Sequence, residues 1–158
     1  MSDAKKFGQH FPVESDFVLQ ALKGHLLLEE SNREFLVALA SHPSALKGDS
    51  GAPFDCHQAI CITQAFYPQS NHINWVWSAA KRLNKMRNNL AHNLEPRGDI
   101  KATMMSFNSF VSEHASQQIE EAKASPLSDL KNPDFMFSVM AVCSTLAIRK
   151  AMFRENIT

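Results

Sequence analysis

Residues 73–92 read INWVWSAAKRLNKMRNNLAH, and this stretch decides the fold class. Its apolar residues recur at spacings of three and four, which is the period of a helix that buries one face. These residues are Ile73, Val76, Trp77, Ala80, Leu83, Leu90 and Ala91. Arg87 falls on the same stripe and interrupts it. Because an unpaired buried charge costs several kcal/mol, roughly, we expect Arg87 to have a partner.

Helical patterns also occupy most of the chain on both sides of this stretch, and segments with Pro, Gly and Ser separate them. We expect five helices, over about 14–40, 54–66, 71–93, 99–124 and 133–154. Ser15 or Asp16 suits the cap of the first helix, Asn71 that of the third, and Pro133 the first turn of the fifth. The sequence therefore predicts a single all-α domain over residues 1–158, an antiparallel helical bundle.

Two parts of this bundle carry further expectations. Residues 1–12 read as a flexible N-terminal segment. The fifth helix is the most apolar, and we expect it at the centre of the bundle or in the seam of a dimer.

Composition limits the class of protein. The 16 basic and 16 acidic residues give a formal net charge of zero, so any basic site must be local. Cys56, Cys61 and Cys143 are expected to be free thiols of a reduced compartment. The start MSDAKKFGQH is polar and no run approaches 18 apolar residues, so we expect neither a secretory signal nor a membrane segment. The expected location is the cytoplasm.

The last two turns of residues 73–92 are densely polar. Asn84, Asn88 and His92 follow one another at spacings of four, beside the stripe that Arg87 interrupts. His92 lies at the expected helix end, where the helix dipole favours a protonated imidazole by roughly 0.3–1 kcal/mol. A histidine that titrates near neutrality is the usual general acid or base. We expect a functional site at this helix end.

Basic residues crowd the same helix end. They are Lys81, Arg82, Lys85, Arg87 and Arg97. On a chain with no net charge, this local excess indicates a phosphate-binding surface.

The first expected helix carries a second polar interruption. His25, Glu29 and Asn32 fall on the apolar stripe that Val18 and Leu36 define. When two helices with polar groups in their apolar faces pack together, these groups can form hydrogen bonds or ion pairs with one another. We therefore expect Glu29 or Asn32 beside Arg87 or His92, where it would orient them.

The segment LNKMRNNLAHNLEP (residues 83–96) resembles the helix-end motif of HEPN domains, in which Arg and a polar residue are followed, after three positions, by His. The matching residues here are Arg87, Asn88 and His92. The stretch KGHLLLEE (residues 23–30) is similar to the first-helix segment of several HEPN groups. The resemblance covers most of the chain, because the order of the helices also fits.

The resemblance implies a function as well as a fold. Catalytic HEPN domains are metal-independent endoribonucleases, often of toxin–antitoxin or phage-defence systems, and they usually act as homodimers. Transferred to this chain, His92 would be the general acid/base, Arg87 would bind the phosphate, and Asn88 would help to position it. RNA would be the substrate, no metal or cofactor would be needed, and an antitoxin or regulatory protein would be a partner. Many HEPN domains are instead non-catalytic modules that bind a protein or a nucleotide, and this alternative stays open.

Less specific interpretations compete with this one. Arg87 and His92 lie roughly 140° apart around an ideal helix. In the alternative interpretation, Arg87 pairs with Glu29 or Glu30 and His92 only caps the helix. Cys56, His57 and Cys61 lack the paired spacing of a zinc site, and packing on a helix explains them better. Trp77 fits the core stripe better than a base-stacking role.

Overall fold

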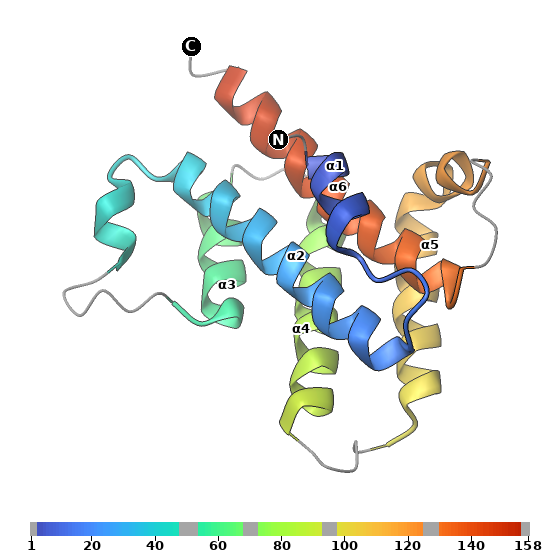
Figure 1. Cartoon of the computed structure of the whole chain (residues 1–158). Coiled ribbons are helices and arrows are strands. Elements are labelled where there is room, and N and C mark those ends of the chain that lie inside the picture. Colours follow the sequence, from blue (N-terminus) through green and yellow to red (C-terminus); the bar gives the residue numbers. More distant parts are fainter. Residues whose placement is uncertain (1–2, 48–53, 68–72, 93–97, 125–129, 156–158) are drawn as a thin grey trace.

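The computed structural model describes residues 3–47, 54–67, 73–92, 98–124 and 130–155. All regular structure in these ranges is helical (Figure 1). The elements are α1 (Asp3–His10), α2 (Phe17–Leu39), a short 3₁₀ helix η1 (Pro43–Lys47), α3 (Cys56–Phe66), α4 (Asn74–His92), α5 (Ile100–Lys123) and α6 (Pro133–Glu155). The predicted all-α bundle is confirmed, and the expected cap Asn71 lies outside the described residues.

Three aspartates begin three of the helices. Asp16 accepts a hydrogen bond from the Leu19 backbone N–H at 2.9 Å, and Asp99 caps α5 in the same way. Asp55 forms a capping box with Gln58, in which each side chain accepts from the other residue's backbone N–H. Such caps satisfy N–H groups that a helix start leaves unpaired. The predicted cap at Asp16 is confirmed, as is the start of the last helix at Pro133.

The N-terminal segment differs from the expectation of a flexible segment, because residues 3–10 form α1. Phe7 and Phe11 are both buried, and their rings stack with centroids 4.9 Å apart. Helix α1 packs against α2 and α6 (Figure 1). Burial of two aromatic rings stabilises a segment whose remaining side chains are mostly polar.

Helix α6 lies at the centre of the bundle, where it packs against α1, α2, α4 and α5. Its crossing with α2 is close, since a Cβ added at Gly24 would lie 3.1 Å from Val139 Cγ1. Among the described helices, α6 alone is long and apolar enough to span a membrane, yet 61% of its most apolar window is buried inside the protein. A core helix passes the same test, and α6 is the core helix here.

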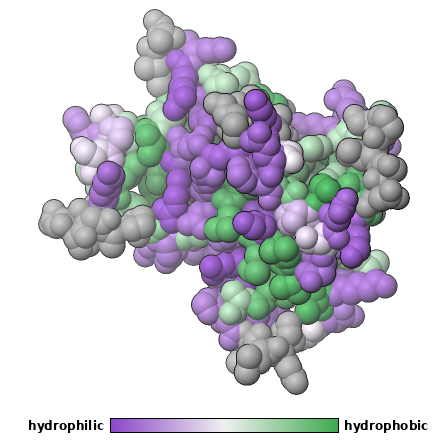
Figure 2. All heavy atoms as spheres, viewed as in Figure 1, coloured by the Kyte–Doolittle hydropathy of each residue, from purple (hydrophilic) through white to green (hydrophobic). Residues whose placement is uncertain are grey.

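Aromatic residues fill the core beside α4. The Trp77 side chain is buried and lies near the rings of Phe35 and Tyr67, so the core interpretation of Trp77 is confirmed. Trp75 is half-buried and stacks on His114 of α5. On the face seen in Figure 2, hydrophobic side chains form separate patches among hydrophilic ones.

Candidate functional site

Two cavities flank the second half of α4. The first lies between α2, α3 and α4, has a volume of about 510 Å³, and is called here the inner cavity. Residues that line it include His25, Glu29, Arg33, Cys56, Asn84, Arg87 and Asn88. The second lies between α4 and α5, has a volume of about 1080 Å³, and is called the outer cavity. Residues that line it include Arg82, Lys85, Asn88, Asn89, His92 and Ser106.

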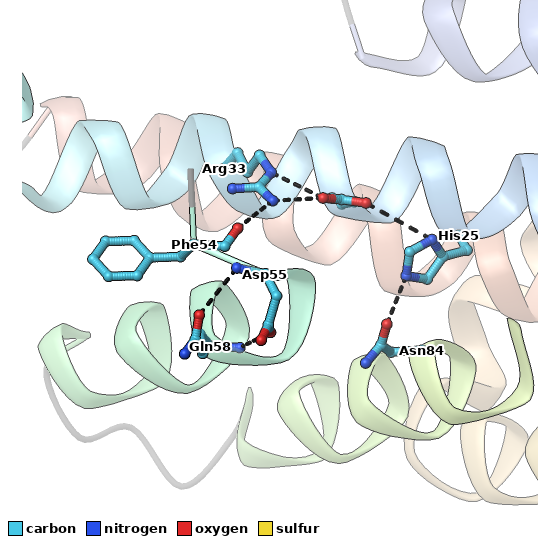
Figure 3. Close-up of polar contacts among 7 residues, drawn as sticks. His25, Arg33, Phe54, Asp55, Gln58 and Asn84 are labelled. Carbon is cyan, nitrogen blue, oxygen red and sulfur yellow. Dashed lines mark hydrogen bonds and ion pairs between the residues drawn. The ribbon is translucent and has the colours of Figure 1, made fainter. Parts of the chain in front are cut away.

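A chain of polar contacts crosses the wall of the inner cavity (Figure 3). The His25 ring nitrogen Nε2 lies 2.9 Å from Asn84 Oδ1, which joins α2 to α4. Glu29 Oε1 accepts from Arg33 Nε at 3.0 Å and from Arg33 Nη2 at 2.6 Å. Arg33 Nη2 also donates to the Phe54 carbonyl at 2.6 Å, just before α3 begins. Three helices are thus linked through α2 side chains.

His25 is almost fully enclosed, with 2% of its surface exposed. Its second ring nitrogen, Nδ1, is buried without a hydrogen-bond partner and lies 3.9 Å from Glu29 Oε2. Burial lowers the pKa of His25, against the opposing effects of Asn84 and Glu29. Burial also raises the pKa of the Cys56 thiol to about 11, so this thiol is protonated at neutral pH.

The outer cavity is lined by two cationic side chains, Arg82 and Lys85, and by the carboxylate of Asp99. His92 and Lys85 are exposed side chains on its wall. The Arg82 guanidinium lies 4.3 Å from the centre of the Phe110 ring, a cation–π contact with α5. Of the other predicted RNA-binding residues, Lys81 donates to Gln64 Oε1 at 2.8 Å on the opposite side, and Arg97 lies outside the described residues. Arg82, Lys85 and His92 therefore share one surface that Lys81 does not join.

The structure separates the two motif residues, in agreement with their angle around the helix. Arg87 lines the inner cavity and His92 the outer one. Asn88 lines both, and its Oδ1 accepts a hydrogen bond from Arg87 Nη1 at 3.0 Å. Asn88 is thus the physical link between the two motif residues.

The predicted supporting residues divide in the same way. Glu29 shares the inner cavity with Arg87, as expected, and His25 joins them. Asn32 is buried and lines neither cavity, and its amide atoms have no hydrogen-bond partner among the described residues. The alternative interpretation paired Arg87 with Glu29 or Glu30. In the structure, Glu29 forms a salt bridge with Arg33 and Glu30 forms one with Lys6.

Sequence reasoning missed two members of the inner cavity's network. Arg33 carried a usable signal, since it follows Glu29 by four residues, the spacing of a helical ion pair. No local sequence signal linked Cys56 to His25, because the two residues are 31 positions apart and lie on different helices. His57 Nε2 lies 3.6 Å from Cys61 Sγ on α3, whereas Cys56 is grouped with His25 and Glu29.

No protein-family model, curated protein or solved structure matches the chain. What the structure defines is the class of fold, an all-α helical bundle with one cavity on each side of α4.

Proposed function

We propose that the chain is a metal-independent endoribonuclease of the HEPN type, acting as a cytoplasmic homodimer. The observation that carries the proposal is the end of α4, where exposed His92 shares a cavity with Arg82, Lys85 and Asn88. An imidazole beside two cations is what the cleavage of a phosphodiester needs. Arg87 is coupled to this surface through its hydrogen bond to Asn88.

The reaction uses the RNA as its own nucleophile. The ribose 2′-oxygen forms a bond to phosphorus, the bond from phosphorus to the 5′-oxygen breaks, and the products are a 2′,3′-cyclic phosphate and a 5′-hydroxyl. Neutral His92 accepts the proton of the 2′-hydroxyl, and a protonated His92 from the second copy donates one to the leaving oxygen. Arg87 stabilises the charge that develops on the phosphate.

The proposed homodimer would bring the separated motif residues together. Within one copy, Arg87 and His92 line different cavities. When the α4 ends of two copies face one another, Arg87 of one copy can approach the phosphate next to the 2′-hydroxyl that His92 of the other deprotonates. A partner protein of antitoxin type would restrain the enzyme by covering the outer cavity.

Incubation of the purified protein with cellular RNA in EDTA tests the activity. We expect His92→Ala to lower the cleavage rate by about 10²–10⁴-fold, the usual contribution of a general acid/base. His10→Ala, which removes an exposed histidine from α1, is the matched control and should cleave as the wild type does. Circular dichroism in EDTA must show folded protein in every sample. Single-stranded DNA should stay intact because it lacks the 2′-hydroxyl.

Salt dependence tests the RNA surface separately from the chemistry. We expect Lys85→Ala to reduce the slope of log affinity against log salt by about 0.7, the value for one contact to a single-stranded phosphate. Lys81→Ala is the control, because Lys81 is already bonded to Gln64 away from the outer cavity. Equal effects of the two substitutions would contradict the assignment of the outer cavity as the RNA surface.

A second candidate function is a non-catalytic module that binds a nucleotide or a protein. It is favoured by the same separation of Arg87 from His92, which leaves no complete catalytic pair in one copy. The same experiment distinguishes the two. If folded wild-type protein and His92→Ala both leave RNA intact while nucleotides raise the Tm of both, the binding module is the better description.

A further inference from the structure

The inner cavity contains three side chains of the kinds that bind transition metals. His25 and Glu29 lie one helical turn apart on α2, and Cys56 is the first residue of α3. One ligand atom from each lies within 4.8 Å of the other two. The cluster is internal, because His25 is buried and the other two are only partly exposed.

The orientation of His25 leaves a lone pair directed at this cluster. An amide oxygen only accepts hydrogen bonds, so the Nε2 atom facing Asn84 Oδ1 carries the ring proton. In the neutral ring Nδ1 is then the unprotonated nitrogen, and it is buried without a hydrogen-bond partner. A histidine whose second nitrogen is fixed by a neighbouring oxygen is the usual arrangement of a metal-binding imidazole.

Glu29 presents a second acceptor to the same point. Its Oε1 atom takes both hydrogen bonds from Arg33, while Oε2 lies 3.9 Å from His25 Nδ1. Two lone-pair atoms therefore face one another with no proton between them, which is unfavourable in a buried place. Either a second proton on His25 or a cation would relieve this.

We infer that the inner cavity binds a zinc-like divalent cation through His25 Nδ1, Glu29 Oε2 and Cys56 Sγ, with a fourth position open to the cavity beside Arg87. Nitrogen, oxygen and sulfur ligands are the set that zinc takes. Bonds of about 2.0–2.3 Å place tetrahedral ligand atoms roughly 3.5 Å apart, so the three groups need to approach by about 1 Å. The side chains of α2 and α3 can make this adjustment without a change of fold.

Charge also fits this assignment. A carboxylate and a thiolate together neutralise a divalent cation, and binding would release the Cys56 proton. Arg33 holds the outer oxygen of Glu29, and Arg87 borders the open position. Since both arginines are cationic, water or an anion is the expected fourth ligand.

This inference goes beyond the proposed ribonuclease and does not depend on it, since the cleavage chemistry involves no metal. It replaces the expectation of no metal, which considered Cys56 with His57 and Cys61 on α3. Cys56 with His57 and Cys61 is the alternative set of ligands, in which His57 Nε2 lies 3.6 Å from Cys61 Sγ.

Titration of untagged, EDTA-stripped, reduced protein with Co²⁺ tests the site. We expect one cobalt ion per chain, with a thiolate-to-metal charge-transfer band in the near ultraviolet. Cys56→Ser should abolish that band, and Glu29→Gln should weaken cobalt binding. The double variant His57→Ala/Cys61→Ser is the matched control and should bind as the wild type does. Asn84→Leu, which removes the oxygen that orients His25, should weaken binding by about 10–100-fold.

Each outcome decides the inference. Zinc should raise the Tm of the wild type and of the control but not that of folded Cys56→Ser. Absence of a cobalt band in folded wild-type protein would overturn the site. The site would also be overturned if the His57→Ala/Cys61→Ser variant lost the band while Glu29→Gln kept it. RNA cleavage is not a readout here, so either proposal can fail without the other.

Discussion

Helix α2 buries three polar side chains, Gln20, His25 and Asn32, and the first two have different surroundings. The Gln20 amide nitrogen lies 2.8 Å from the Lys131 carbonyl, and its oxygen accepts from Asn132 Nδ2 at 3.1 Å. His25 has one nitrogen paired with Asn84 and the other unpaired. Both polar atoms of the Gln20 side chain have hydrogen-bond partners within the protein, whereas one ring nitrogen of His25 has none.

This difference separates a structural polar group from a candidate binding group. Gln20 also lies within 3.3 Å of the Pro12 carbonyl and so joins the segment before α2 to the segment before α6. An unpaired buried atom does not identify a site on its own, as Asn32 shows, since it is unpaired and lines neither cavity. His25 differs from Asn32 because two further metal-binding groups lie within reach.

The largest expected effect on stability comes from the satisfied group. Gln20→Leu should lower the free energy of unfolding by roughly 2–4 kcal/mol, because it removes the partner of the Asn132 amide and of the Lys131 carbonyl, at about 1–3 kcal/mol each. Urea denaturation followed by circular dichroism measures the change, with an unchanged m-value as the check on two-state unfolding. A loss below about 0.5 kcal/mol would mean that solvent reaches this contact, and the contrast with His25 would fail.

A smaller effect is expected at the partner of His25. Asn84→Leu should lower the unfolding free energy of the metal-free protein by about 1–2 kcal/mol, because one hydrogen bond is lost and one buried N–H is left unpaired. Asn88→Ala is the matched control on the same helix, and as an exposed position it should change stability by less than about 0.5 kcal/mol. If Asn84→Leu costs as much as Gln20→Leu, the inner cavity is as strongly constrained as the Gln20 network.

Much of the fold was predictable from the sequence. Periodicity and breakers predicted the helices from α2 onward, and the aspartate at position 16 predicted a start, because local spacing and caps act over a few residues. Helix α1 was not predicted, since its short segment is stabilised by Phe7 and Phe11 packing on distant helices. Val18 was assigned to a buried stripe and is exposed, because the neighbours of α2 set which face is covered.

The candidate site was predictable only in part. The spacing of Arg87 and His92 implied that they do not share a face of α4, and they line separate cavities. The polar interruption of α2 predicted that Glu29 or Asn32 would lie beside Arg87 or His92, and of these Glu29 and Arg87 share the inner cavity. The grouping of Cys56 with His25 depends on how α3 packs against α2, which no local pattern encodes.

A partly exposed polar contact of α2, at Glu34, extends the comparison to the protein surface and should have the smallest effect. Lys150 Nζ donates to Glu34 Oε2 at 2.6 Å, and this hydrogen bond is the main cause of the lowered pKa of Glu34. The Glu34 side chain is 40% exposed, so solvent screening limits the expected loss in Glu34→Gln to below about 1 kcal/mol at neutral pH.

The pH dependence fixes the sign of this last prediction. A carboxyl whose pKa is lower in the folded state stabilises the protein above its unfolded pKa, and this contribution disappears as the pH falls through the folded value. The difference in unfolding free energy between wild type and Glu34→Gln should therefore be present at neutral pH and decrease toward acidic pH. Urea titrations across that range measure it. A difference that stays constant with pH would show that Glu34 acts through packing and not through its charge.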